Sequence, residues 1–347
     1  MTVTESVLNG DRLALARLLT QVENLTPDGR EALDSLFPHS GKAHLIGVTG
    51  APGTGKSTLV NRLALYYRGQ GKRVAIVAVD PSSPFTGGAI LGDRVRMRDL
   101  SGDPGIFIRS MASRGSLGGL ARSTAGVVQV FDAAGYEIVL IETVGAGQGE
   151  VDIARLAHTT LVVEAPGLGD DIQAIKAGIL EIADILIINK ADRPGVENTE
   201  KALRSMLELA HPGRRVYLHH GRALGADVPP APEAPGWIPP VQKTVSLDGQ
   251  GIPELAEEIR KHAEYLHSSG NWAAREQTRL ASELELILQQ ALMDQFRARE
   301  PQARYNEVLQ RVFNRSLSPW EAVAVLTDAS EPQALPGGKA SPSERDS

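Results

Sequence analysis

The sequence predicts an α/β protein built on a doubly wound, mainly parallel sheet. Through residues 41–225, short apolar runs alternate with helical patterns. The runs are continuous rather than alternating in polarity, as in strands that are covered on both faces. One of them, His44–Val48, leads into a glycine-rich loop and then into a helical stretch, Thr58–Tyr67. Strands that alternate with helices form parallel sheets, which bind ligands at the carboxyl ends of their strands.

The expected strands share β-branched or leucine-rich cores. They are His44–Val48, Arg73–Val79, Ile106–Ile108, Ile138–Ile141, Thr160–Val163, Ile185–Ile188 and Val216–Leu218. Residues 229–240 then contain six prolines in twelve positions, a composition that excludes a helix or a central strand. We expect a stiff surface excursion there, followed by a last strand at Val241–Ser246.

Helices are expected on both sides of this domain. Residues 1–40 carry leucines at helical spacing, and Thr26-Pro27-Asp28 is typical of a helix start. From Pro253 to Arg299 the pattern is helical, and a shorter helix should begin near Ser318, with Pro319 at its first position. Within the long stretch one apolar stripe is formed by Leu280, Leu284, Ile287, Leu288, Leu292 and Phe296. The predicted parts are an N-terminal helical extension (1–40), the α/β domain (41–252), a C-terminal helical arm (253–329) and a disordered tail (330–347) rich in Ser, Pro, Gly and charge.

Composition excludes several functional classes. The net charge of −6, with 36 basic and 42 acidic residues, argues against a protein that binds nucleic acid. The chain has no cysteine, which excludes disulfides, zinc–thiolate sites and thiol catalysis. No apolar run approaches the roughly 18 residues of a membrane span. The N-terminus does not resemble a signal peptide, so we expect a cytoplasmic protein without a membrane partner.

Residues Gly50–Ser57 read G-A-P-G-T-G-K-S and match the phosphate-loop pattern G-x-x-x-x-G-K-[ST] at every position. Its glycines allow main-chain N–H groups to face a phosphate, and the following helix directs its N-terminus at the same anion. Lys56 should reach the β- and γ-phosphates, and Ser57 should ligate Mg²⁺. We therefore expect a P-loop NTPase domain. The residues predicted to contact the nucleotide here are Gly50, Ala51, Pro52, Gly53, Thr54, Gly55, Lys56, Ser57 and Thr58.

Asn189-Lys190-Ala191-Asp192 follows the strand Ile185–Ile188 and has the N-K-x-D pattern of guanine-binding proteins. The carboxylate of Asp192 can accept hydrogen bonds from the N1–H and the 2-amino group of guanine. Adenine lacks this pair of donors and would leave the carboxylate unpaired. The Lys190 stem can cover the face of the base. The predicted ligand is therefore GTP or GDP, with Mg²⁺.

Acidic residues follow other strands of the predicted sheet. Glu142 can hold Mg²⁺ through water, and Gly145 can donate its N–H to the γ-phosphate. Asp80 and Asp93 are both candidates for the outer shell of the metal. An arginine could neutralise phosphate charge, or could equally lie on a solvated helix face; the candidates are Arg94, Arg96, Arg98, Arg109 and Arg114. The loop with Asp170 and Asp171 is either a switch or an ordinary helix cap.

Together these stretches resemble the MeaB/MMAA-type GTPases of the SIMIBI class, also described as ArgK or LAO/AO transport ATPases. The stretches are G-A-P-G-T-G-K-S, D-P-S-S-P-F-T-G-G-A-I-L-G-D-R, E-T-V-G-A-G-Q-G-E and N-K-A-D, and the resemblance covers roughly residues 8–325. It implies a G-protein chaperone of an adenosylcobalamin-dependent acyl-CoA mutase, with an adenosyltransferase as a second partner. It also implies that Asp80, Asp93 and Glu142 serve the magnesium and phosphate site, that the loop Ala165–Lys176 is a switch facing the mutase, and that the C-terminal helices form a homodimerisation arm.

Three positions depart from related patterns. Ala51 stands where deviant Walker A proteins have a second lysine, which disfavours a ParA-like ATPase, and Gly149 replaces the usual serine after Gln148. Thr244–Gly251 matches the late guanine motif only loosely and contributes Ser246 as a candidate. Ala146 follows Gly145 where Ras-like enzymes have glutamine, so Gln148 is the candidate for orienting water and slow intrinsic hydrolysis is expected.

Two functions compete at this point. One is a GTP-hydrolysing chaperone that gates the loading and rescue of a mutase. The other is a P-loop kinase or transport ATPase, the older ArgK class. The N-K-A-D motif favours the first, and the combination of Lys56, Ser57 and the acidic residues after the strands disfavours a binding module without turnover. Methylmalonyl-, isobutyryl- and hydroxyisobutyryl-CoA mutase all remain open as the partner.

Overall fold

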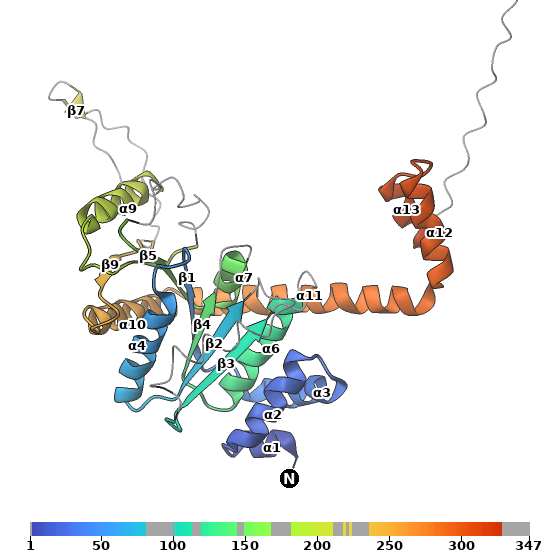
Figure 1. Cartoon of the computed structure of the whole chain (residues 1–347), viewed down its shortest axis with the longest axis horizontal. Coiled ribbons are helices and arrows are strands. Elements are labelled where there is room, and N and C mark those ends of the chain that lie inside the picture. The colour runs from blue at the N-terminus through green and yellow to red at the C-terminus, as the bar shows by residue number, and fades with distance from the viewer. Residues whose placement is uncertain are drawn as a thin grey trace, which may run out of the picture. The chain divides into compact units, whose positions relative to one another are not determined.

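The computed structural model describes residues 2–80, 100, 102–112, 119–143, 149–167, 182–210, 218–219, 222–223 and 236–327. Contacts divide the chain into two compact units, Met1–Leu284 and Glu285–Ser347. The first unit is built on a seven-stranded sheet in which every neighbouring pair is parallel (Figure 1). The predicted α/β class with a doubly wound parallel sheet is therefore confirmed.

The strand order is β3-β2-β4-β1-β5-β6-β9. The bounds are β1 His44–Thr49, β2 Val74–Asp80, β3 Ile106–Ala112, β4 Ile138–Thr143, β5 Thr159–Glu164, β6 Ile185–Asn189 and β9 Val241–Thr244. Strand β1 lies between β4 and β5. The connection that leaves β1 leads to β2 on one side of it, whereas the connection that leaves β5 leads to β6 on the other side. This reversal of strand order is the place where an open α/β sheet binds its ligand.

Helices cover both faces of the sheet, which explains the continuous apolar strands. Helices α4 (Lys56–Gly69) and α10 (Ile252–Ser268) pack on one face, where Ile46 of β1 is fully buried. Helices α6 (Gly119–Ala133) and α7 (Gly149–Leu156) pack on the other, where the adjacent residue Leu45 points. Helix α9 (Val196–Ala210) packs on β5 and β6. Successive strand residues thus enter two different cores.

The N-terminal segment is helical, as predicted. It forms α1 (Val3–Leu8), α2 (Arg12–Glu23) and α3 (Pro27–Leu36), followed by a 3₁₀ turn η1 (Phe37–His39). Thr26 caps α3 by accepting a hydrogen bond from the Gly29 N–H at 3.1 Å. Helices α2 and α3 pack on α6 at Gly126, where an added Cβ would lie 2.8 Å from a methyl carbon of Val22. Only glycine permits this approach.

One expected strand falls mostly outside the described residues. Of the predicted strand Val216–Leu218 only Leu218 is described, and it does not pair with the seven-stranded sheet. Within the described residues, β7 (Leu218–His219) pairs antiparallel with β8 (Arg222–Ala223) as a separate ribbon. The seventh strand of the sheet is β9. The helical stretch Pro253–Arg299 is two helices, α10 and α11 (Asn271–Arg299), because Gly270 adopts a φ of 77° and ends the first one. The predicted tail lies outside the described residues.

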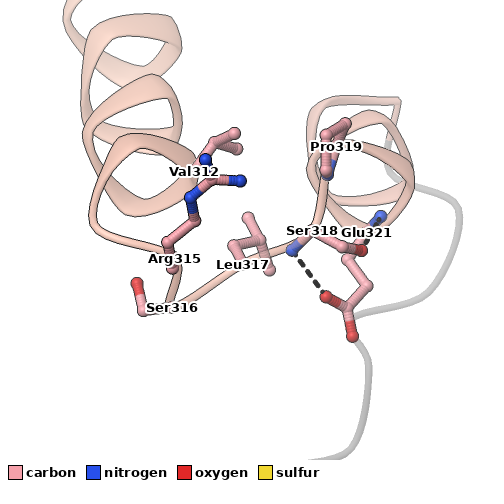
Figure 2. Close-up of a pocket in the computed structure, with 7 residues that line it drawn as sticks. All are labelled: Val312, Arg315, Ser316, Leu317, Ser318, Pro319 and Glu321. Carbon is pink, nitrogen blue, oxygen red and sulfur yellow. Dashed lines mark hydrogen bonds between the residues drawn. The ribbon is translucent and has the colours of Figure 1, made fainter.

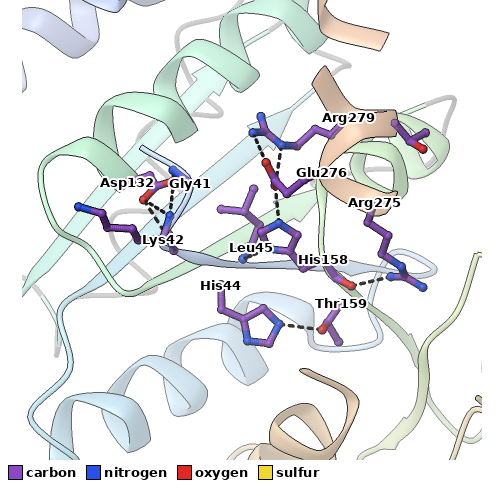
Figure 3. Close-up of polar contacts among 12 residues, drawn as sticks. Gly41, Lys42, His44, Leu45, Asp132, His158, Thr159, Arg275, Glu276 and Arg279 are labelled. Atoms are coloured by element: carbon purple, nitrogen blue, oxygen red, sulfur yellow. Dashed lines mark hydrogen bonds and ion pairs between the residues drawn. The ribbon is translucent and has the colours of Figure 1, made fainter. Parts of the chain in front are cut away.

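Polar contacts join the start of α11 to the amino-terminal edge of the sheet (Figure 3). His158, just before β5, accepts at Nδ1 from the Leu45 N–H at 3.1 Å and lies 2.5 Å through Nε2 from Glu276 of α11. Arg275 of α11 reaches Asp184, before β6, with nitrogen–oxygen distances of 2.7 and 2.8 Å. This edge is opposite the one at which the predicted nucleotide motifs lie.

The second unit contains the rest of α11, α12 (Gln302–Phe313) and α13 (Pro319–Leu326). Helix α13 begins at Pro319, as predicted, and its N-cap Ser318 exchanges capping hydrogen bonds of 2.8 and 3.2 Å with Glu321. Val308, Leu317 and Ala322 form a small core. An open pocket lies at the turn between the helices, lined by Val312, Arg315, Ser316, Leu317, Ser318, Pro319 and Glu321 (Figure 2). Among the described residues, no helix combines the length and apolar character needed to cross a membrane.

Candidate functional site

The sheet brings the predicted motifs to one edge. Strand β1 ends at the phosphate loop, β4 ends at Glu142 and Thr143, and β6 ends at Asn189. Because β4, β1, β5 and β6 are consecutive parallel neighbours, their carboxyl ends lie side by side. The sequence could place each motif after a strand, but the adjacency of the motifs comes from the strand order.

The phosphate loop depends on two glycines for close contacts. Gly50 has a φ of 136°, and an added Cβ would lie 2.1 Å from the main-chain oxygen of Val163 in β5. Gly55 has a φ of 96°, and its added Cβ would lie 2.5 Å from Nδ2 of Asn189. Gly55 is also the N-cap of α4 and provides no side-chain cap. The first N–H groups of α4 therefore remain suited to an anion.

Lys56 is buried inside this loop. Its Nζ donates to the main-chain oxygens of Gly50, at 2.8 Å, and of Ala51, at 3.1 Å. Thr54 also donates through Oγ1 to the Ala51 oxygen, at 3.0 Å. The ammonium group is thus held against the main chain at the start of the phosphate loop.

Ser57 and Glu142 meet at the end of β4. The Ser57 hydroxyl lies 2.5 Å from Oε1 of Glu142, whose side chain is buried. A hydroxyl and a carboxylate are hard oxygen donors, the kind that Mg²⁺ prefers, usually with one or two carboxylates and the substrate phosphates. The pair therefore fits a magnesium site.

The other predicted metal and catalytic residues are less fully placed. Asp80 ends β2 at the same edge, since the preceding Val79 pairs with Thr143. Its side chain, and the whole of Asp93, Gly145 and Gln148, lie outside the described residues. Within the described part of the chain, no group of three or more His, Cys, Asp or Glu side chains could hold a metal.

Asn189 joins the end of β6 to two loops. Its Nδ2 donates to the Thr54 oxygen at 2.8 Å. Its Oδ1 accepts from the Thr244 hydroxyl at 3.1 Å, from the Ser246 N–H at 3.2 Å and from the Ser246 hydroxyl at 2.7 Å. The buried amide thus links the phosphate loop to the segment after β9.

Lys190 and Asp192 follow in different environments. Lys190 adopts a φ of 58°, a conformation that costs a non-glycine residue about 1–2 kcal/mol. Its Nζ lies 2.5 Å from the Gly53 oxygen, so the side chain runs toward the phosphate loop. The Asp192 side chain is exposed beside it. Strained residues of this kind cluster at ligand sites.

Two residues at this edge have roles that the sequence did not indicate. Thr244 supports Asn189, as described above. Arg62 of α4 donates through Nε to the Ser246 oxygen at 3.0 Å and through Nη2 to the Leu247 oxygen. The local sequence around Arg62 does not distinguish an arginine that contacts a distant loop from one that lies in solvent.

Of the candidate phosphate-neutralising arginines, Arg109 forms an ion pair with Glu23 of the N-terminal helices instead. Arg94, Arg96, Arg98 and Arg114 lie outside the described residues. Of the predicted switch Ala165–Lys176, only residues 165–167 are described, and they follow β5 beside the phosphate loop.

Comparison with known proteins identifies the family. The family described as methylmalonyl Co-A mutase-associated GTPase MeaB matches residues 15–301. A Pyrococcus abyssi protein named as a GTPase is 42% identical over 322 residues, which are 93% of this chain and 94% of the relative. GTPase ArgK of Escherichia coli K12 is 35% identical over 337 residues, 94% of this chain and 96% of the relative. The crystal structure of an LAO/AO transport system kinase is 28% identical, with a TM-score of 0.67 over 94% of this chain and 96% of that one.

The relatives named above as GTPases agree with the guanine motif at the end of β6. The family match covers most of the chain, and the phosphate loop is formed as such an enzyme requires. The chain therefore belongs to the MeaB family of methylmalonyl-CoA mutase-associated GTPases and is a GTPase.

Proposed function

We propose that this GTPase is a chaperone of an adenosylcobalamin-dependent acyl-CoA mutase, and that GTP hydrolysis gates the loading of the mutase cofactor and the rescue of the inactivated enzyme. The family description, which associates these GTPases with methylmalonyl-CoA mutase, carries the proposal. An adenosyltransferase that delivers the cofactor is proposed as a second partner.

Each end of the nucleotide would be held by a different motif. Residues Gly50–Thr58 would surround the phosphates, with Lys56 on the β- and γ-phosphates, and Asp192 and Lys190 would bind guanine beside Ser246. The 2.8 Å hydrogen bond from Asn189 to Thr54 supports this division, because it holds the two motifs at a fixed separation. Such preorganisation reduces the entropy that binding must overcome.

Magnesium would be held by Ser57 and Glu142, with Asp80 and Asp93 in its outer shell. When bound, the ion neutralises charge that develops on the phosphates. The Gly145 N–H would bind the γ-phosphate, and Gln148 would orient the attacking water. The short contact between Ser57 and Glu142 supports this donor set.

The C-terminal helices, residues 253–329, are proposed to form a homodimerisation arm. Within the described structure α11 has 29 residues, none of which is buried. Leu284, Ile287, Leu288 and Leu292 are 45–66% exposed and follow the i, i+3, i+4, i+8 spacing of one helix face. Such a stripe calls for an apolar partner, and we propose that a second copy of the chain provides it.

The function is tested by measuring GTP turnover with and without methylmalonyl-, isobutyryl- and hydroxyisobutyryl-CoA mutase. We expect one of the three mutases to stimulate GTP hydrolysis. Transfer of cobalamin to that mutase, measured by absorbance, should depend on GTP rather than ATP. A partner can respond only if it binds the GTP and GDP forms with different affinity. The proposal would be wrong if none of the three mutases stimulated GTP hydrolysis and if cobalamin transfer were the same with and without GTP.

The segment Ala165–Lys176 is proposed to transmit the nucleotide state to the mutase. Replacing Asp170, Asp171 and Lys176 together with alanine should leave basal hydrolysis nearly intact. The same variant should lose mutase stimulation and nucleotide-gated transfer. If it keeps both, this segment is an ordinary connection between a strand and a helix.

A further inference from the structure

We propose that Arg62 is a positioning residue for base recognition, which orients the peptide between Ser246 and Leu247 so that its N–H reads the 6-oxygen of guanine. The inference rests on the proposed base site. It adds to that site a residue of the phosphate-loop helix that is distant in sequence from both guanine segments.

The contact of Arg62 is specific in its geometry. Its Nε donates to the Ser246 oxygen at 3.0 Å, and Nη2 of the same guanidinium donates to the oxygen of the next residue, Leu247. The planar fork of arginine can serve two neighbouring oxygens at once, which the single ammonium of lysine does less well. Ser246 is also held from its other side, because its N–H and its hydroxyl both donate to Asn189.

This arrangement sets the direction of one N–H group. The chain has no cis peptide bond among its described residues, and in a trans peptide the C=O and the following N–H point in opposite directions. Since the Ser246 oxygen faces Arg62, the Leu247 N–H faces away from α4. At position 6 guanine presents an oxygen acceptor, whereas adenine presents an amino donor. An N–H held in a fixed direction can therefore favour guanine.

The ends of this loop do not depend on Arg62. Val245 donates to the Gln250 oxygen at 3.0 Å, and Gly249 donates to the Val245 oxygen at 3.0 Å. Gly251 has a φ of 78° and packs where an added Cβ would lie 2.2 Å from the Lys243 oxygen. The loop is therefore closed without Arg62, and Arg62 fixes only the orientation of the peptide between Ser246 and Leu247. Replacing Arg62 should consequently affect nucleotide specificity more than folding.

The test compares GDP with two analogues in equilibrium titrations. In 6-thio-GDP a sulfur, which is a weak acceptor, replaces the 6-oxygen, whereas IDP keeps the 6-oxygen and lacks the 2-amino group. For Arg62→Ala we expect GDP binding to weaken about 3- to 10-fold, the effect of losing one hydrogen bond. The preference for GDP over 6-thio-GDP should shrink by the same factor, while the preference for GDP over IDP, set by Asp192, should remain.

Two further variants make the comparison specific. Arg62→Lys keeps the charge and should still lose part of the 6-oxygen preference; it also provides the measurement if the alanine variant is unstable. Arg68→Ala is the matched control on the same helix, because Arg68 binds the Lys72 oxygen and Asp103 away from the base loop. It should keep both preferences.

The failures of the two proposals are distinguishable. A folded Arg62→Ala protein with the full wild-type preference for GDP over 6-thio-GDP would overturn the role of Arg62 alone. Equal loss of both preferences would also overturn it, since that pattern indicates general damage to the loop. A wild-type protein that binds ADP as well as GDP would instead overturn the proposed base site.

Discussion

The side-chain amide of Asn189 donates a hydrogen bond to the main-chain oxygen of Thr54, with 2.8 Å between the two atoms, although the residues are 135 positions apart in sequence. The same amide binds Thr244 and Ser246 through its oxygen. One buried side chain thus connects the phosphate loop, the guanine motif and the loop after β9. Because buried hydrogen-bond networks of this kind are cooperative, a substitution in the phosphate loop should also alter the guanine site, and the reverse.

Replacing Lys56 with alanine should lower the rate of GTP hydrolysis by at least about 100-fold, because it removes the charge proposed to act on the β- and γ-phosphates. Phosphate release in the presence of Mg²⁺ measures the effect. Lys261→Ala, at an exposed position of α10, is the control and should hydrolyse GTP normally. An unchanged rate in Lys56→Ala would contradict the assignment of the phosphate loop.

Replacing Asp192 with asparagine should weaken GTP binding by about 2–4 kcal/mol, because the amide has only one acceptor oxygen for the two donors of guanine and places its NH2 group against the other donor. Binding of XTP should improve, because the amide of asparagine can donate to the 2-oxygen of xanthine. Titrations with GTP, XTP and ATP give the result. If the ratio of GTP to XTP affinity stays the same, Asp192 does not contact the base.

Replacing Glu142 with glutamine should raise the Mg²⁺ concentration needed for half-maximal hydrolysis about 10- to 100-fold, the usual cost of losing a group that supports a metal. The measurement is a magnesium titration at saturating GTP. Glu137→Gln is a suitable control because Glu137 precedes the other end of β4 and accepts from the Arg73 N–H there. Identical magnesium curves for Glu142→Gln and wild type would exclude a metal role.

Acidification from pH 6.5 to 4.5 should destabilise the protein through histidines at the amino-terminal edge of the sheet (Figure 3). Burial, together with nearby cationic groups, lowers the pKa of His44 to about 3. Burial also lowers the pKa of His158, despite the opposing effect of Glu276. In the unfolded chain a histidine has a pKa of about 6.5 and is protonated below that pH, whereas these buried histidines stay neutral in the folded protein. The free energy of unfolding therefore falls, as the pH decreases below 6.5, by up to about 1.4 kcal/mol per pH unit for each histidine.

His44→Gln should flatten this decline in urea unfolding experiments between pH 6.5 and 4.5. Glu276, in contact with His158, acts at lower pH. Burial would raise the pKa of Glu276, but hydrogen bonds from His158 and Arg279 lower it to about 2. Its contribution is therefore present above pH 4.5 and is lost only below it. A slope that is the same in the variant and the wild type would show that His44 is protonated in the folded state.

Introducing charge into the apolar stripe of α11 should dissociate the proposed dimer. Burying one leucine contributes about 1.5–3 kcal/mol, so Leu288→Asp combined with Leu292→Asp should weaken association by several hundred-fold or more. Light scattering across a concentration series measures the oligomeric state. Gln289→Asp, an exposed polar position on the same helix, is the matched control. A wild-type protein that stays monomeric at high concentration would contradict the arm assignment.

Much of this protein could be predicted from local sequence. Continuous apolar runs predicted six strands of the sheet, and the end of the proline-rich stretch predicted β9. The phosphate loop was identified by its pattern alone. Thr26-Pro27 and Ser318-Pro319 predicted the starts of α3 and α13. These features depend on residues within a few positions of one another, through helix caps, glycine conformations and side-chain periodicity.

Other features were decided only by the tertiary structure. The apolar run Val216–Leu218 is typical of a strand, but Leu218, its one described residue, pairs with Ala223 in a separate ribbon. The strand that pairs with β6 at the edge of the sheet is β9. Strand pairing depends on which strands the rest of the fold leaves unpaired. Arg109 could have faced phosphate but pairs with Glu23. The contact of Arg62 with Ser246 spans 184 positions. The local sequence determines which secondary structure each segment can form. Contacts between residues so far apart in the sequence are instead decided by the packing of the whole sheet, because each possible contact competes with many others.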